Sequence, residues 1–213
     1  MAKKYAGEIK ARVVEIRFAL SGKIANVSKC TGDIVKKWDL VASLDRKILQ
    51  TELDQQLADH EKVRADWDGF TTKYPNPQDD IKYTKAEKQA SLNASVKQVE
   101  LSKAKLDQTN LFSPVEGVIL DDSNIVAGLY VTPANSSIKI IDTSSYYFEF
   151  VIDQADIPSF SKDRKCKIEI KGTMEDVKGE TGRIFSDGKK FSVRIPISNN
   201  EKYLIGMKGV AKF

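Results

Sequence analysis

The chain has 213 residues, of which 41% are hydrophobic and 30% charged, enough for one folded domain or a few small ones with a solvated surface. Thirty-four basic against 30 acidic residues leave a formal charge of +4, and no Lys/Arg block interleaved with aromatic residues occurs, so we expect no nucleic-acid partner. No apolar run approaches the roughly 18 residues of a membrane span.

The N-terminus allows two interpretations of location. Residues 1–5 lack the apolar centre of a signal peptide, which taken literally indicates a cytoplasmic protein. The alternative is a chain from which a membrane anchor was removed, with Met1 and Ala2 added at the cut.

The first part of the chain is predicted to be β-structure. Alternation and β-branched residues predict a strand over 9–19, continued by another over 22–27. A turn at 31–33 follows, where Gly32 can take a positive φ and Asp33 can bond its own backbone. Strands at 34–35 and 40–44 complete a first half.

The same pattern returns 95 positions later. Gly22 and Gly32 are 10 positions apart, and Gly117 and Gly128 are 11 apart, each pair within alternating apolar residues. We predict two duplicated four-strand halves, each too small to bury its own face. The four glycines are expected to serve turns or close strand approach.

Between the halves, the apolar period changes from two to three and four. Asp45 is the predicted N-cap of a helix of about 25 residues, with Leu49, Leu53 and Leu57 spaced by four. Two prolines within 74–77 interrupt it, and a second helix is predicted over 78–110. The two helices should form an antiparallel hairpin that reaches roughly 40 Å beyond the β-domain.

Aromatic residues gather close to the predicted hairpin tip. Trp67, Phe70 and Tyr74 follow Arg64 at helical spacing. One interpretation is a small local core that closes the tip. The other is a partner-docking patch formed by these four residues, since exposed aromatic residues are typical interface anchors.

The C-terminal part is predicted to be a small β-barrel. Short strands separated by turns are expected at 146–152, 166–170, 179–185, 190–196 and 207–213, with a short helical turn at 156–160. The N-terminal strand is expected to add a sixth strand and to bring the termini together.

The two cysteines and the single histidine indicate no metal site and no catalytic triad. Cys30 and Cys166 are expected in strands of different segments, as small buried or half-buried side chains, and a disulfide between them stays open. His60, the only histidine, is expected at a solvated helix position and could not alone support a metal or a triad.

The split β-domain resembles biotinyl/lipoyl carrier domains, in which the modified lysine stands at an exposed tight turn. Lys47 is the lysine closest to that place, but it lies in a predicted helix and lacks the flanking residues of a modification site. The carrier alternative predicts a lipoyl or biotinyl group on Lys47 in the native protein, detectable by mass spectrometry.

A split lipoyl-like domain with a helical hairpin and a following barrel resembles the periplasmic adaptor, or membrane-fusion, family of bacterial efflux and secretion systems, of the haemolysin-secretion type. The matching segments are 21–24, 32–37, 40–45, 99–109, 111–119 and 206–207. The resemblance implies an α+β, mainly β fold. Its domains would be a lipoyl-like domain (15–44 with 111–143), a hairpin (45–110) and a barrel (1–14 with 144–213).

The resemblance also implies a role. Such adaptors assemble as rings, are anchored to the inner membrane and bridge an ATP-binding-cassette or proton-driven transporter to an outer channel. They are not enzymes, and we expect no catalytic residue, cofactor or metal. The chain departs from the family's tip pattern, because Trp67 and Phe70 follow Arg64 where channel-docking members carry Leu and Ser. A coiled-coil scaffold or binding module with a β-base is the remaining alternative.

Overall fold

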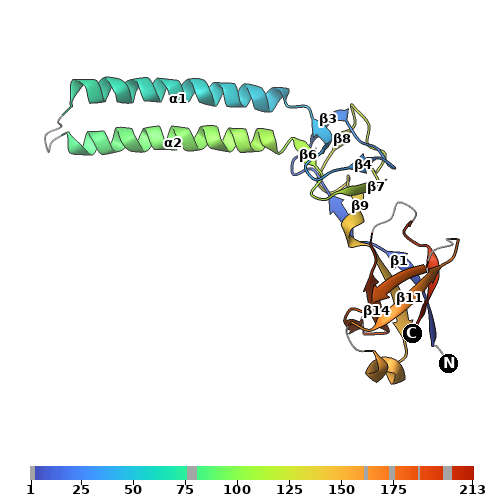
Figure 1. Ribbon diagram of the computed structural model, residues 1–213. Coiled ribbons are helices and arrows are strands. Elements are labelled where there is room, and N and C mark those ends of the chain that lie inside the picture. The colour runs from blue at the N-terminus through green and yellow to red at the C-terminus, as the bar shows by residue number, and fades with distance from the viewer. Residues whose placement is uncertain (1–2, 76–80, 161–162, 173–175, 187, 199–202) are drawn as a thin grey trace.

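The molecule is elongated, with three parts in a row (Figure 1). The computed structural model describes residues 3–75, 81–160, 163–172, 176–186, 188–198 and 203–213. A long pair of helices lies at one end, a small β-part in the middle, and a larger sheet with both termini at the other end. Among the described residues, no helix is both long and apolar enough to cross a membrane.

The middle part consists of two four-stranded sheets, and each sheet takes two strands from each of the duplicated halves. The first half supplies β2 (Val13–Ile16), β3 (Gly22–Val27), β4 (Ile34–Val35) and β5 (Leu40–Leu44). The second half supplies β6 (Asn110–Phe112), β7 (Gly117–Asp121), β8 (Tyr130–Val131) and β9 (Ile138–Asp142). The strand orders are β2-β9-β7-β4 and β6-β5-β3-β8, and exchanging the halves converts one order into the other. Each sheet therefore needs both halves.

Backbone hydrogen bonds repeat this two-fold relation. Gly32 donates its N–H to Ile119 O at 2.8 Å, and Gly128 donates to Ile24 O at 2.8 Å. The two glycines have φ of +94° and +92°, values that favour glycine because it lacks a Cβ. The core between the sheets is apolar and is drawn from both halves; its most buried members are Ile24, Val35, Val41, Ala42, Ile119, Val131 and Ile140.

The C-terminal part is a seven-stranded sheet in the order β12-β11-β15-β1-β10-β14-β13. Its strands are β1 (Lys4–Lys10), β10 (Tyr147–Ile152), β11 (Lys165–Ile170), β12 (Asp176–Glu180), β13 (Ile184–Ser186), β14 (Phe191–Pro196) and β15 (Lys208–Lys212), and two 3-10 turns lie at Thr143–Ser145 and Gln154–Ser159. The sheet curls around a core that includes Phe148 and Phe150, and beyond β12 Gly182 donates its N–H to Arg194 O of β14 at 2.8 Å. This barrel-like sheet is called the barrel below. The predicted insertion of the N-terminal strand into this sheet is confirmed.

Two strand predictions are wrong in extent. The stretch 9–19 is divided between two sheets, since the chain leaves β1 at Lys10 and enters β2 at Val13. The stretch 179–185 is also two strands, β12 and β13. The change occurs between two neighbouring residues. Thr181 donates its N–H to Arg164 O at 2.9 Å, whereas Gly182 donates its N–H to Arg194 O of β14. In both places the strand changes its partner, which an alternating sequence pattern does not reveal.

The small β-part and the barrel are joined by two adjacent segments, 10–13 and 142–147. Asp142, whose side chain is 2% exposed, accepts hydrogen bonds from the Arg12 guanidinium, with Arg12 Nε at 3.1 Å, and from Ser144 N at 3.0 Å. Burial by itself acts to raise the pKa of Asp142, but the hydrogen bonds from Ser144 and Arg12 outweigh it and the pKa lies below its usual value.

Replacement of Asp142 by Asn should lower the free energy of unfolding by about 1–3 kcal/mol at neutral pH, because a buried charge-assisted bond is lost. A depressed folded-state pKa stabilises the fold above the unfolded-state value of about 4, and this contribution disappears as pH falls through the folded-state pKa. Urea titrations at several pH values should therefore show that the difference in free energy of unfolding between the parent chain and the variant becomes smaller as the pH falls. Asp121→Asn is the matched control, since its 44%-exposed side chain pairs with Lys139 in solvent. A difference in free energy of unfolding that does not change with pH would contradict a stabilising role of the ionised Asp142.

Two long helices, α1 (Lys47–Lys73) and α2 (Lys82–Asp107), form the hairpin between β5 and β6 (Figure 1). The N-cap is Arg46 rather than Asp45, although the Asp45 carboxylate still accepts the Lys47 N–H at 3.0 Å. The second helix ends before the predicted residue 110, because Asn110 already pairs in β6. The predicted helix start at Gln78 and most of the proline turn lie outside the described residues.

The seam between the helices repeats every seven residues, as in a coiled coil. Eight residues of α1 and its cap follow this spacing, and all of them are buried or half-buried: Leu49, Leu53, Gln56, His60, Val63, Trp67, Phe70 and Tyr74. The prediction of a solvated His60 is wrong, because this side chain lies in the seam and contacts Ser95 on α2. Leu57, predicted in the stripe, is 41% exposed. Polar seam residues thus hide the heptad period in the sequence.

The side chains of His60 and Ser95 are hydrogen-bonded across the seam. His60 Nδ1 lies 2.8 Å from Ser95 Oγ, and Ser95 Oγ lies 2.8 Å from Leu92 O, to which it can donate. When the hydroxyl donates to Leu92 O, Ser95 Oγ accepts from the His60 tautomer that is protonated at Nδ1. This bond links the two helices at mid-length and specifies their register, as polar seam residues do in coiled coils.

A second seam serine, Ser102, has no such partner. Among the buried side-chain N and O atoms of the described residues, its Oγ is the one without a hydrogen-bond partner. Ser102→Ala should raise the free energy of unfolding by about 1 kcal/mol, because an unsatisfied hydroxyl is removed and helix propensity rises. Ser95→Ala, the matched change, should lower it because two bonds are lost. Thermal unfolding followed at 222 nm distinguishes them, and equal shifts for both variants would contradict the assignment.

Candidate functional site at the hairpin tip

The far end of the hairpin carries a ring cluster at the C-terminal end of α1. Trp67 and Phe70 stack with centroids 6.4 Å apart and an interplanar angle of 26°, and Phe70 and Tyr74 lie 5.3 Å apart. Lys88 reaches across from α2, with its Nζ 5.7 Å from the Phe70 ring centroid and in an ion pair with Asp66. The cluster thus ties the two helices together at the tip.

Burial divides the four predicted tip residues into two kinds. Phe70 is 9% exposed and is buried by its neighbours. Trp67 and Tyr74 are half-buried. Arg64 is exposed and is 3.8 Å from Asp68, its i+4 neighbour, a weak surface pair that leaves the guanidinium available. Phe70 therefore has the environment of a core residue, and Arg64 that of a contact residue.

One exposed residue of the tip was not found from the sequence. Tyr83, at the start of α2, is 83% exposed, and its neighbour Ile81 is half-buried. Tyr83 lies among polar residues, outside the apolar stripe, so the periodicity gave no reason to select it. Its position outside the heptad is itself the signal, because a large aromatic residue there has no seam to fill.

The other predicted residues lie elsewhere. Gly22, Gly32, Gly117 and Gly128 are all in the middle β-part, at strand starts or turns, far from the tip. Lys47 is the first residue of α1 and is exposed. Cys166 is buried in β11, and both cysteines are free.

The expectation of a strand at Cys30 is wrong. Cys30 is exposed in the loop between β3 and β4, where its N–H donates to the Asp33 carboxylate at 2.8 Å. This bond forms the turn that the Gly32-Asp33 pair predicts, so the cysteine belongs to the turn and not to the strand before it.

Structural comparison relates the whole architecture to known proteins, whereas neither a family model nor a curated protein matches the sequence. A chimeric MacA–MexA protein with the α-hairpin domain of Pseudomonas aeruginosa MexA superposes with a TM-score of 0.85 at 18% identity, covering 99% of this chain and 80% of that one. The membrane fusion protein Spr0693 of Streptococcus pneumoniae gives 0.82 at 14% identity, covering 98% of both chains. The periplasmic adaptor protein EmrA gives 0.54 at 14% identity, also with 98% coverage of both.

The chain has the fold of the membrane fusion, or periplasmic adaptor, proteins. The similarity includes the helical pair, the strand-sharing sheets and the barrel, since it extends over nearly all of the chain. At these identities the likeness concerns the fold. The predicted resemblance is confirmed at that level.

Proposed function

We propose that the protein is an adaptor subunit of an efflux or secretion system, which connects an inner-membrane transporter to an outer channel. The observation that carries the proposal is the place of the hairpin: α1 and α2 join β5 to β6, so a rigid helical pair projects from the joint between two strand-sharing halves (Figure 1). A two-helix projection about 40 Å long, with little apolar surface along its shaft, suits a spacer that places its tip on a partner.

Three units follow from this proposal: a lipoyl-like domain (15–44 with 111–143), the hairpin (45–110) and the barrel (1–14 with 144–213). The lipoyl-like domain and the barrel would lie toward the transporter, either an ATP-binding-cassette or a proton-driven pump. Several copies would form a ring in the periplasm, anchored at the inner membrane, with their tips toward the outer channel. The chemistry at the tip would be binding, through the exposed Arg64 and Tyr83 and the half-buried Trp67 and Tyr74.

Site-directed photo-cross-linking in intact cells tests the proposal. A benzophenone amino acid at Tyr83 should give an adduct with an outer channel, and one at Leu204, which is 65% exposed in the barrel part, an adduct with an integral inner-membrane transporter. Mass spectrometry identifies both partners. A label at Leu101, 51% exposed on the hairpin shaft, is the matched control and should give neither adduct. If neither labelled end captures a transport protein, the proposed function is wrong.

A further inference from the structure

The outer face of the barrel sheet carries a row of four lysines on four neighbouring strands. The register places Lys178 of β12 opposite Lys167 of β11, Lys167 opposite Lys212 of β15, and Lys212 opposite Lys4 of β1. Strands lie about 4.8 Å apart, so the row is roughly 14 Å long. Like charges directly opposite each other destabilise a sheet, so this arrangement has a cost within the chain alone.

Two carboxylates of the same face pair with the two central lysines of the row. Lys167 pairs with Asp176 at 2.5 Å, and Lys212 pairs with Glu169. In the described part of the molecule, Lys178 and Lys4 at the ends of the row make no ion pair. The row therefore retains an unneutralised positive charge at both ends.

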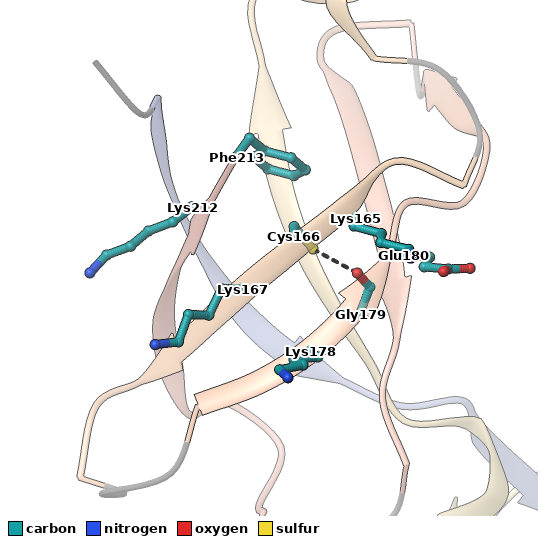
Figure 2. Close-up of a pocket in the computed structure, with 8 residues that line it drawn as sticks. All are labelled: Lys165, Cys166, Lys167, Lys178, Gly179, Glu180, Lys212 and Phe213. Atoms are coloured by element: carbon teal, nitrogen blue, oxygen red, sulfur yellow. Dashed lines mark hydrogen bonds between the residues drawn. The ribbon is translucent and has the colours of Figure 1, made fainter.

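A shallow hollow of about 640 Å³ lies beside three lysines of this row, Lys167, Lys178 and Lys212 (Figure 2). Lys165 and one carboxylate, Glu180, also line it, so four ammonium groups face one acidic side chain, and Phe213 and Cys166 give it an apolar part. Figure 2 shows the lysine side chains extending from adjacent strands. Such a site combines several point charges with a small apolar surface.

Charge is also distributed unevenly along the chain. Residues 1–12 and 143–213, which form the barrel, contain 17 Lys and Arg against 11 Asp and Glu. The remaining residues contain 17 basic and 19 acidic side chains. The barrel is thus the basic end of the molecule, and the hairpin tip lies at the opposite end (Figure 1).

We propose that the lysine row docks the barrel on an anionic phospholipid surface, with headgroup phosphates between the lysines. Lysine is depleted in protein–protein interfaces, and the row contains no Trp, Tyr or Arg of the kind that anchors them. Flexible ammonium groups suit a diffuse layer of phosphates, where each lysine near the surface strengthens binding about five-fold. The inference stands on the register of the row and does not depend on the proposed adaptor role.

Vesicle co-sedimentation of the 213-residue chain tests the proposal. The chain should bind vesicles of phosphatidylcholine with phosphatidylglycerol, weakly or not at all those of phosphatidylcholine alone, and binding should fall with salt. Lys4→Gln with Lys178→Gln should weaken partition by about 30-fold, five-fold or more for each lysine. Neither lysine holds an ion pair, so circular dichroism should show an unchanged fold. Lys178→Arg should keep the binding.

The matched control is Lys62→Gln with Lys103→Gln, which removes the same charge from exposed positions of the hairpin. An equal loss of binding in this control would show that net charge and not the row is responsible, which overturns the proposal. So would equal binding to vesicles without phosphatidylglycerol, release from vesicles by inorganic phosphate at the same charge concentration, or equally tight binding of duplex DNA or of polyglutamate.

Discussion

Gly117→Ala is expected to destabilise the protein by about 3 kcal/mol, at the upper end of the cost of overpacking. A Cβ at this position would lie 1.9 Å from Ile141 O and 2.9 Å from the Ile141 carbonyl carbon, which are backbone atoms of the neighbouring strand β9. Gly117 pairs with Asp142 of β9 on one side and with Val35 of β4 on the other, so moving β7 away from β9 would also disturb its pairing with β4. Urea unfolding at neutral pH measures the loss.

The duplication supplies a matched control for this substitution. Gly22 occupies the equivalent place in the first half, but its nearest neighbour is Leu44 Cδ1 at 3.3 Å, the end of a side chain that can rotate. Gly22→Ala should therefore stay within about 0.5 kcal/mol of the parent chain, helped by the lower entropy of its unfolded state. Comparable losses in both variants would contradict the close approach at Gly117.

The paired glycines predicted the duplication from the sequence, but not how the halves combine. Glycine spacing reports turns and close approaches within a half, and the turn at Gly32 formed as predicted. Which strands pair depends on contacts between the halves, such as that between Gly128 and Ile24. Those contacts link residues about a hundred positions apart and leave no periodic trace.

In the hairpin, too, the sequence predicts the element but not which single residues it buries. Its existence and length follow from the change of period at residue 45, whereas its seam includes Gln56 and His60, which a search for apolar stripes passes over. There His60 has a hydrogen-bond partner across the seam, since its Nδ1 lies 2.8 Å from Ser95 Oγ. The aromatic residues of α1 at the tip were found, but their burial depends on how α2 covers α1, so the buried Phe70 could not be told from the half-buried Trp67 and Tyr74 by spacing. Tyr83 was passed over because only the apolar stripe was searched.

That division of the tip residues determines which variants test docking. Arg64→Ala with Tyr83→Ala should leave the melting temperature unchanged, because both side chains are exposed, and should abolish co-purification of the outer channel with the tagged protein. Interface anchors of these types contribute about 2 kcal/mol or more each, so the double variant, which loses about 4 kcal/mol, should bind roughly 700-fold more weakly. Recovery of the inner-membrane transporter should be unaffected, since it would bind the opposite end.

Phe70→Ala is a different experiment on the same surface. It removes a buried ring and should destabilise the protein by about 3 kcal/mol, so a loss of channel binding in this variant reports on folding of the tip and not on recognition. Leu101→Ala removes exposed apolar area from the shaft and should change neither stability nor co-purification. If the Arg64 and Tyr83 variant still recovers the channel at the parent level, the tip patch is not the docking surface. The ring cluster then serves only to close the hairpin, as the burial of Phe70 alone already requires.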